Sequence, residues 1–244
     1  MANIIFGRNS LNRYHITCHT LGTNDSYYVN VGKFTSIAEN CHILLGHGHH
    51  FYKTSTTFPF CDIKGLYTNA IPQIAKGGNV NIGNDVWIGR SVTIMPDISI
   101  GDGAIIAANS HVVCDIPPYA VFGGNPAKLI KYRFDELVIS KLLEIKWWDK
   151  SDYVINNILP LLQQEPTLGI LTEMQNEILT LDDNSEYDQR REEIVKLFSD
   201  HLGRVPDNNG YLYYYNSTLS INEIEETIKN SNEYKFANKI IEGF

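Results

Sequence analysis

Aliphatic residues recur at every sixth position through the middle of the chain. These positions are Ile82, Ile88, Ile94, Ile100, Ile106 and Val112. Four residues after each of the first five stands a smaller or β-branched side chain: Val86, Val92, Ile98, Ala104 and Ser110. The period is neither the one of about 3.6 residues of an α-helix nor the alternation of a half-buried strand. It predicts short strands and tight corners around a triangular solenoid, in which three hexads complete one coil.

The residue that follows each aliphatic is usually small. Such residues are Gly83, Gly89, Gly101 and Ala107. We expect them to let the backbone turn each corner closely. The same register is present earlier in the chain, at Val31, Ile37 and Ile43, with Thr35 and Cys41 at the fifth positions of their hexads. Cys41 is therefore expected to be a small core residue that faces inward.

The repeat is interrupted between Ile43 and Ile82, which lie 39 residues apart, a distance that is not a multiple of six. The intervening sequence GHGHHFYKTSTTFPFCDIKGLYTNAIPQIAKGG is irregular, aromatic and rich in His and Thr. We expect it to project from the solenoid as a long loop. Long loops on a rigid scaffold are disproportionately functional, so this segment is the first place to look for chemistry.

Beyond Arg133 the hydrophobic pattern changes to helical spacing. One helical face is expected to carry Leu137, Ile139, Leu142, Leu143 and Ile145, and Pro160 is expected to punctuate the helical segment. The composition turns polar near residue 181, and Ser220 is a suitable N-cap for a helix over 221–230. We therefore expect the solenoid with its packing helix in 1–165, a linker or helical connection in 166–184, and a small all-α module in 185–244.

Composition and charge exclude several classes of protein. The 244 residues carry 28 Asp and Glu against 20 Lys and Arg, a net charge of −8, which gives no basic footprint for nucleic acid. No apolar run approaches the roughly 20 residues of a membrane helix, and the N-terminal sequence lacks a signal-peptide pattern, so we expect a cytoplasmic protein. The four cysteines form no CxxC pair and predict no metal site.

The repeat and its flanking segments resemble the hexapeptide-repeat acyltransferases. The matching stretches are IGNDVWIGRSVTIMPDISIGDGAIIAANS and DIPPYAVFGGNPAKLIKYRF, while GHHFYKTSTTFPF and IKWWD are similar to the xenobiotic acetyltransferase branch. That branch includes streptogramin and chloramphenicol acetyltransferases and many sugar O-acetyltransferases. The resemblance covers about residues 25–160. It implies a mainly β fold, a left-handed parallel β-helix with C-terminal α-helices, and a homotrimer with acetyl-CoA in a groove between neighbouring β-helices.

The resemblance also implies a catalytic histidine on the projecting loop, in a G-x-H pattern followed by S/T-T-x-P-F. Gly48 and His50, followed by the TTFPF sequence at 56–60, match this pattern. His50 is therefore the candidate base, with His49 as the second choice, because His47, His49 and His50 form a cluster. A neutral imidazole, with an unperturbed pKa of about 6.5, can accept the proton of an attacking hydroxyl. The alternative is that these are polar loop histidines; no metal is expected, since no carboxylate or Cys stands at ligand spacing.

Further residues are implied by the resemblance to bind the coenzyme. They are Trp87, Ala108, Cys114, Asn125, Pro126, Lys128 and Lys131. Lys128 and Lys131 match basic residues that pair with phosphates, and Arg133 follows closely. Ala108 matches a position where the backbone meets the pantetheine arm, and Cys114 stands where relatives often carry Lys. The alternatives are solvated surface lysines, and a Trp87 that packs against a neighbouring subunit.

Aromatic residues of the loop are the candidates for binding the acceptor. They are Phe51, Tyr52, Phe58, Phe60 and Tyr67. Such side chains either stack on sugar faces or line a pocket for an apolar drug, so they do not choose between these acceptors.

The C-terminal module resembles a domain of uncharacterised function marked by L-G-R-x-P-D-x-x-G at 202–210. That domain is often fused to enzymes of surface-glycan assembly. The first hypothesis is therefore an acetyl-CoA-dependent O-acetyltransferase that acts on a carbohydrate hydroxyl of a surface glycan or polysaccharide precursor. The alternative is a xenobiotic acetyltransferase of the streptogramin or chloramphenicol type. A hypothesis of another class is a non-catalytic trimeric scaffold, with the module as a possible protein-binding arm.

Overall fold

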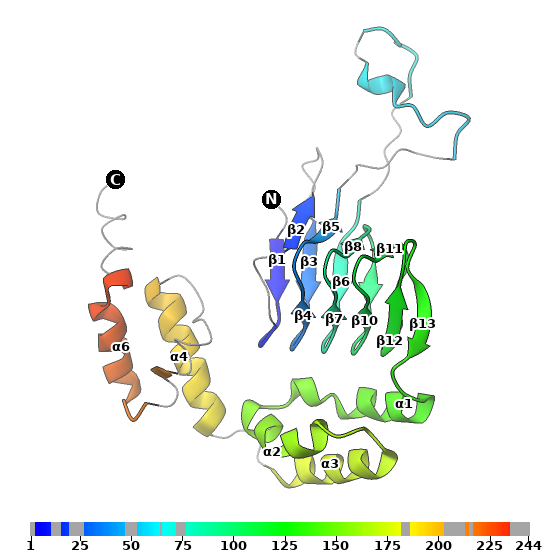
Figure 1. Cartoon of the computed structure of the whole chain (residues 1–244). Helices are drawn as coiled ribbons and strands as arrows, with labels where there is room; N and C mark the ends of the chain where they lie inside the picture. The colour runs from blue at the N-terminus through cyan, green and yellow to red at the C-terminus, as the bar shows by residue number, and fades with distance from the viewer. Residues whose placement is uncertain are drawn as a thin grey trace. The chain divides into compact units, whose positions relative to one another are not determined.

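The structure, a computed structural model, describes residues 3–10, 16–19, 27–46, 53–63, 65–71, 77–181, 186–202, 213–214 and 217–234. Contacts divide the chain into two compact units, Met1–Trp148 and Asp149–Phe244. The described strands all lie in the first unit, as Figure 1 shows. The limits predicted at residues 165 and 184 stay predictions.

The strands of the first unit form three sheets. The first sheet has the order β1 (Asn3–Phe6), β3 (Tyr28–Val31), β6 (Val80–Ile82), β9 (Ser99–Ile100). The second has the order β13 (Lys128–Tyr132), β12 (Ala120–Gly123), β10 (Ile105–Ile106), β7 (Trp87–Ile88), β4 (Ser36–Ile37). The third has the order β11 (His111–Val112), β8 (Thr93–Ile94), β5 (Cys41–Leu44), β2 (Ile16–His19). Neighbouring strands are parallel except β12 and β13, which are antiparallel.

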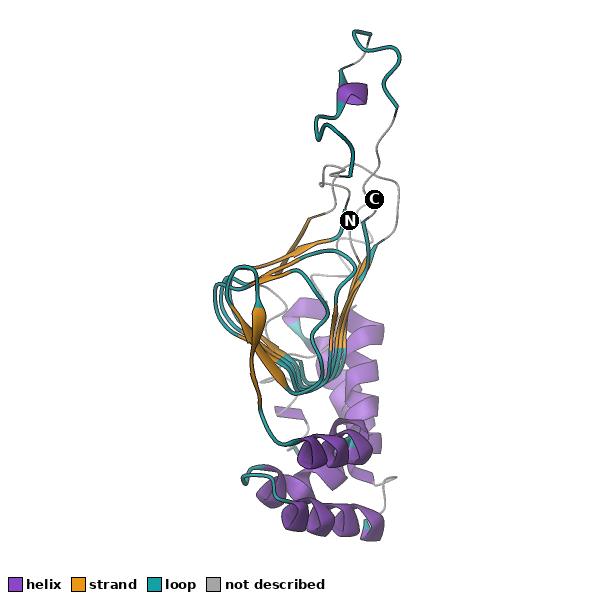
Figure 2. Ribbon diagram, turned by 90° about the vertical axis from the view of Figure 1, so that its right-hand side faces the viewer, coloured by secondary structure: helices purple, strands orange, loops and turns teal. Residues whose placement is uncertain are grey.

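From β6 to β11, successive strands of the chain enter different sheets in turn, and partners across a sheet are separated by whole coils. Trp87, for example, pairs with Ile105, 18 residues later. Figure 2 views the solenoid along its axis and shows the three sheets enclosing a triangular interior. This arrangement agrees with the triangular solenoid predicted from the hexads. The structure adds β1 and β2, which lie ahead of the predicted repeat.

The predicted inward positions form the core of this unit. The aliphatic series from Ile82 to Val112 is at most 3% exposed, and the accompanying fifth-position side chains are buried as well. Each fully buried aliphatic side chain of this size stabilises the fold by about 1.5–3 kcal/mol. Cys41 is buried among them, and its thiol donates to the carbonyls of Ala38 and Gly89 at 3.2 and 3.3 Å. The predicted role of Cys41 as a core residue is confirmed.

The corners are built differently from the prediction. The residues with positive φ also recur every six positions, but they stand two places further on: Asp85, Ser91, Asp97, Gly103 and Asn109. Asp, Asn and Gly tolerate this left-handed region better than most residues. Gly89 has no positive φ; a Cβ there would lie 2.6 Å from the Ala108 nitrogen of the next coil. The small residues therefore permit close contact between coils, and do not make the turn.

Helix α1 (Glu136–Ile145) follows the last strand and is N-capped by Asp135, whose side chain accepts from the Val138 N–H. It buries Val138, Leu142 and Ile145, whereas Leu137 is 67% exposed, so the predicted apolar face is correct only in part. The 3-10 turn η2 (Trp147–Asp149) comes next. Both of its tryptophans are buried, and the Trp147 ring lies 4.8 Å from that of Phe34. These tryptophans are core anchors.

The second unit contains the remaining helices: α2 (Asp152–Leu162), α3 (Leu168–Thr180), α4 (Glu186–Leu202) and α6 (Ile221–Asn230). Pro160 lies inside α2 and does not end it. Ser220 caps α6 in a capping box with Glu223, as predicted. A core of Ile194, Phe198, Ile224 and Ile228 joins α4 to α6. Among the described residues, none of the helices is both long and apolar enough to cross a membrane.

Candidate active site

The chain leaves the solenoid after Gly46 and is back in it at Gly78, whose N–H donates to the Leu45 carbonyl at 3.1 Å. We call the intervening segment, residues 47–77, the excursion. The candidate base His50, the second choice His49, and the acceptor candidates Phe51 and Tyr52 lie outside the described residues. Residues 53–63 and 65–71 of the excursion are described, and Figure 1 shows them in cyan, off the coil, as the interrupted repeat predicted.

Aromatic side chains gather within the described part of the excursion. The Phe58 and Phe60 rings meet edge to face with centroids 4.8 Å apart, and Phe60 and Tyr67 repeat this geometry at 4.8 Å. The TTFPF sequence begins with a local turn, in which the Phe58 N–H donates to the Thr56 hydroxyl at 3.1 Å. A 3-10 turn, η1 (Phe60–Asp62), follows. The structure thus brings together three of the five predicted acceptor residues.

A small hollow of about 230 Å³ opens beside these rings. Its lining comprises Phe58, Pro59, Phe60, Cys61, Asn69, Ala70 and Ile71. Asn69 supplies the one amide side chain of this lining, and the other side chains are apolar or a thiol. Tyr67 packs against Phe60 but does not belong to the lining. The surface of the hollow therefore favours an apolar group over one that needs many hydrogen bonds.

The second sheet places two of the predicted coenzyme residues on one row of its outer face. In register across this sheet stand Ser36, Trp87, Ile105, Val121 and Lys131. Trp87 is 57% exposed there, an unusual position for so large an apolar side chain. Trp87 and Lys131 therefore share one surface, although they are 44 residues apart in the chain.

A β-bulge decides where Lys128 lies relative to Lys131. Residues three apart in a regular strand face opposite sides of the sheet. In β13, however, the register shifts at Ile130, so that Lys128 stands opposite Gly123 and Lys131 opposite Val121. Because these two partners are two apart on β12, both lysines are in register with its outer face. The sequence around Ile130 contains no feature that predicts this bulge.

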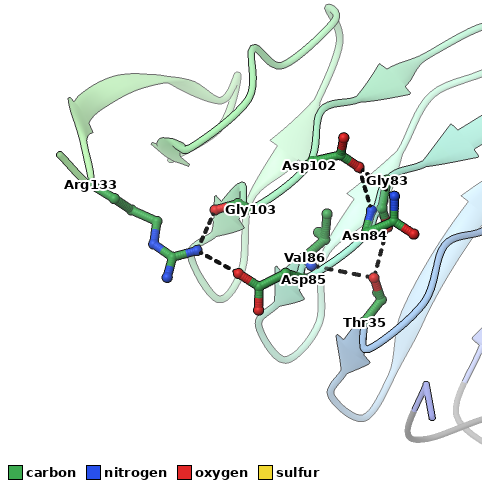
Figure 3. A network of polar contacts seen from close by, with 8 residues as sticks. All are labelled: Thr35, Gly83, Asn84, Asp85, Val86, Asp102, Gly103 and Arg133. Atoms are coloured by element: carbon green, nitrogen blue, oxygen red, sulfur yellow. Dashed lines mark hydrogen bonds and ion pairs between the residues drawn. The ribbon is translucent and has the colours of Figure 1, made fainter. Parts of the chain in front are cut away.

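The charged groups of the two lysines and of Arg133 differ in whether they contact other residues. Within the part of the chain that the structure describes, no ion pair or hydrogen bond engages the ammonium group of Lys128 or Lys131, and both residues are exposed. The guanidinium of Arg133 instead donates to Asp85 Oδ2 at 3.1 Å and to the Gly103 carbonyl at 2.7 Å (Figure 3). Arg133, which follows the lysines closely in the sequence, is therefore engaged within the solenoid.

Arg133 is enclosed by aromatic rings as well as by Asp85. Its guanidinium carbon lies 5.2 Å from the Tyr119 ring centre and 5.1 Å from that of Phe134. Burial raises the pKa of Asp85, and the charge of Arg133 partly offsets this effect. Burial also raises the pKa of Tyr119, whose hydroxyl has no hydrogen-bond partner among the described residues. Arg133 in this cluster joins corners of the solenoid.

The remaining coenzyme candidates lie at corners of the solenoid. Ala108 is exposed in the corner after β10, directly over Gly89. Asn125 and Pro126, joined by a cis peptide bond, are exposed in the β12–β13 connection. Cys114 is exposed after β11, beyond the third sheet, and so lies at a different corner from Ala108.

Sequence reasoning missed a pair of histidines at the start of the excursion. His19 Nε2 and His42 Nδ1 lie 3.1 Å apart, on the neighbouring strands β2 and β5. The register of β2 depends on pairing across residues 20–26, which carry no repeat, so the sequence contained no signal for this contact. Separately, no cluster of three or more His, Cys, Asp or Glu suited to a metal ion occurs among the described residues.

Comparison with known proteins decides the family. Residues 79–113 match the family described as bacterial transferase hexapeptide (six repeats). The chain is 46% identical over 142 residues to a probable macrolide acetyltransferase of Lysinibacillus sphaericus, an alignment that covers 57% of this chain and 78% of that protein. This chain belongs to the hexapeptide-repeat acetyltransferases. It is therefore an acyltransferase.

Other relatives of this acetyltransferase differ in the acceptors that their names state. A chloramphenicol acetyltransferase of Klebsiella aerogenes is 41% identical over 143 residues, covering 57% of this chain and 68% of that protein. Among solved structures, a maltose O-acetyltransferase from Clostridium difficile 630 is 27% identical with a TM-score of 0.32, covering 55% of this chain and 68% of that one.

Proposed function

We propose that this acetyltransferase transfers the acetyl group of acetyl-CoA to a hydroxyl of an apolar, drug-like acceptor. The observation that carries the coenzyme part is the surface shared by Trp87, Lys128 and Lys131 on the second sheet. Two ammonium groups that no described residue engages suit the phosphates of the coenzyme, and an exposed indole suits its adenine or its arm. Ala108, Asn125, Pro126 and Cys114 complete the proposed coenzyme contacts.

The acceptor class is proposed from the relatives and from the hollow in the excursion. Relatives at 46% and 41% identity bear names that state macrolide and chloramphenicol acceptors. The lining of Phe58, Phe60 and Ile71 fits an apolar portion of such molecules. The carbohydrate hydroxyl, which was our first hypothesis from the sequence, becomes the second candidate. It is favoured by the resemblance of the C-terminal module alone.

The chemistry proposed for His50 is general base catalysis without a covalent enzyme intermediate. The acceptor oxygen bonds to the thioester carbon while its proton passes to the His50 imidazole. The tetrahedral intermediate then collapses, the C–S bond breaks, and the CoA thiolate takes the proton back from His50. Each turnover thus returns the histidine to its neutral form and releases one CoA thiol for each acetyl ester formed.

The assembly belongs to the proposal as well. We take the solenoid to wind left-handed and the chain to form a homotrimer, with the coenzyme between neighbouring copies. Sedimentation equilibrium checks the trimer, which requires three times the chain mass of 27.7 kDa. A stable monomer would remove the groove between copies, and with it the proposed coenzyme site.

The deciding experiment is thiol release from acetyl-CoA with chloramphenicol, a macrolide, a streptogramin, and a panel of sugars and glycans. We expect turnover with one of the drugs, and turnover with a sugar alone would transfer the proposal to the second candidate. His50→Ala should lower kcat by at least about 100-fold, whereas His49→Ala should stay within about tenfold of wild type. A fully active His50→Ala variant would overturn the assignment of the base.

A further inference from the structure

Two histidine side chains meet on the outer face of the third sheet. His19 Nε2 and His42 Nδ1 are 3.1 Å apart, with ring centroids 5.3 Å apart and planes tilted by 31°. Their strands are parallel, with Thr17 opposite His42 and His19 opposite Leu44, so the two rings are diagonal neighbours on one face. Both side chains are half-buried. The nitrogen separation is that of a hydrogen bond between imidazoles.

The same pair lies at the point where the excursion begins. The His19 carbonyl accepts from the N–H groups of Leu45 and Gly46, at 3.0 and 3.3 Å. Leu45 is fully buried, and its carbonyl accepts from Gly78, where the excursion ends. The main chain of His19 therefore binds Leu45 and Gly46, the last residues before the excursion, which we call its root. The His19 side chain contacts the strand β5, which leads to these residues.

We infer that His19 and His42 form a clasp at the root of the excursion and act as positioning residues for acetyl transfer. The clasp is closed while at least one of the two imidazoles is neutral and opens when both are protonated. This inference rests on the proposed function in one respect, because the excursion matters for catalysis only if it carries the base.

The chemistry of two imidazoles explains the switch. A neutral pair makes one N–H···N hydrogen bond, and a pair with one added proton makes a stronger, charge-assisted bond. With a proton on all four nitrogens, neither ring offers a lone pair, and two positive charges face each other across 3.1 Å. The bond is then replaced by repulsion, and the strands lose a contact beside Leu45.

Among the described residues, the strands that carry and flank the pair supply no compensating negative charge. The strands of the third sheet contain no Asp or Glu, and the other titratable group on their outer face is His111, on β11. Burial raises the pKa of Cys18 to about 11 and raises that of Cys41, so both thiols stay neutral near pH 7. At the corner before β5, Glu39 is 3.8 Å from Arg90 and so is engaged with another cation.

The test uses substitutions that keep or remove the bond. Glutamine places an amide group where His19 has Nε2, and asparagine places one where His42 has Nδ1. The double variant His19→Gln, His42→Asn should therefore keep a bond that does not titrate, while His19→Leu and His42→Leu each remove it. His111→Asn is the matched control, because His111 is half-buried on the same face and two strands away from His42.

Two readouts are required. The first is the hydrogen-exchange protection of the Leu45 and Gly46 amides, corrected for intrinsic exchange, between about pH 5 and 8. In wild type it should fall at the acid end, in the leucine variants it should be low throughout, and in the double amide variant it should stay high throughout. The second is kinetics: the leucine variants should lose about tenfold in kcat at pH 7, with the KM for acetyl-CoA within about twofold.

The outcomes separate the clasp from the proposed function. If protection behaves as expected but His50→Ala is fully active, the clasp stands and the assignment of the base fails. If His50→Ala is inactive but the leucine variants keep the protection of Leu45 and Gly46, the clasp is wrong. A double amide variant that retains the acid loss of protection would also overturn it, since the titrating groups would then lie elsewhere. Thermal melting of each variant identifies any that fails to fold.

Discussion

Arg133 binds Asp85 across the corner of one coil and the Gly103 carbonyl across the same corner of the next. The two distances are 3.1 and 2.7 Å, and both bonds involve the same guanidinium nitrogen. Asp85 and Gly103 are 18 residues apart and both have positive φ. One side chain from the end of β13 therefore joins equivalent corners of two successive coils, as Figure 3 shows.

Replacing this side chain should weaken the solenoid. Arg133→Ala leaves Asp85 with a largely desolvated charge and no partner, and we expect a loss of about 2 kcal/mol in the free energy of unfolding. Urea denaturation measures it. Arg90→Ala is the matched control, because its pair with Glu39 is longer and mostly exposed, and should cost no more than about 0.5 kcal/mol. Equal losses in the two variants would contradict the role given to Arg133.

The same substitution should change how stability depends on pH. Burial raises the pKa of Asp85 in the folded protein, so the folded state binds its proton more tightly than the unfolded state. Its contribution to stability is therefore present below the ordinary Asp pKa and is lost as the pH rises through the raised value. Arg133 limits this rise in pKa.

In Arg133→Ala the pH range over which this contribution to stability is lost should therefore extend to higher pH. We expect the stability gap between wild type and this variant to widen as the pH rises above the ordinary Asp pKa. Urea titrations across this range measure the gap. Asp85→Asn removes the titrating group, so in that background the stability gap caused by Arg133→Ala should not depend on pH. If the gap is also independent of pH when Asp85 is present, the prediction is wrong.

Two glycines with positive φ provide a test of corner packing. A Cβ at Gly103 would lie 2.5 Å from the Tyr119 ring, whereas a Cβ at Gly65 would meet nothing within 4 Å. In both alanine variants a positive φ at a residue with a Cβ costs about 1 kcal/mol. Only Gly103→Ala adds a clash with a buried ring. We expect losses of about 3 kcal/mol for Gly103→Ala and about 1 kcal/mol for Gly65→Ala, measured by urea denaturation. A smaller loss at Gly103 would show that Tyr119 moves aside.

The lysines on the second sheet should govern the affinity for the coenzyme. We expect the double variant Lys128→Ala, Lys131→Ala to raise the KM for acetyl-CoA about tenfold and to leave kcat within about twofold. The difference from wild type should shrink at high ionic strength, because salt screens exposed charges. Lys141→Ala is the control, since the Lys141 ammonium group pairs with Glu144 on α1 at 3.2 Å. An unchanged KM in the double variant would remove both lysines from the coenzyme site.

The interior of the solenoid could be read from the chain alone. A period of six specifies which side chains point inward, and that depends only on residues close in sequence. Ile82, Ile88 and their successors, Cys41 at its hexad position, and the interruption after Ile43 all followed from this spacing. So did the cap of α6, because Ser220 and Glu223 satisfy each other within one helical turn. The corners were misjudged, since the spacing of small residues does not distinguish a turn from a close approach between coils.

The surface that we propose to bind the coenzyme could be identified only in the folded chain. Lys128 and Lys131 share a face because the antiparallel pairing of β12 with β13 accommodates a bulge at Ile130. His19 reaches His42 because β2 pairs with β5 across a stretch that has no repeat. In both cases the deciding quantity is the register between strands, set by the packing of distant segments against a common core. The sequence shows the period along the chain, but the register between neighbouring strands is determined only when the coils stack.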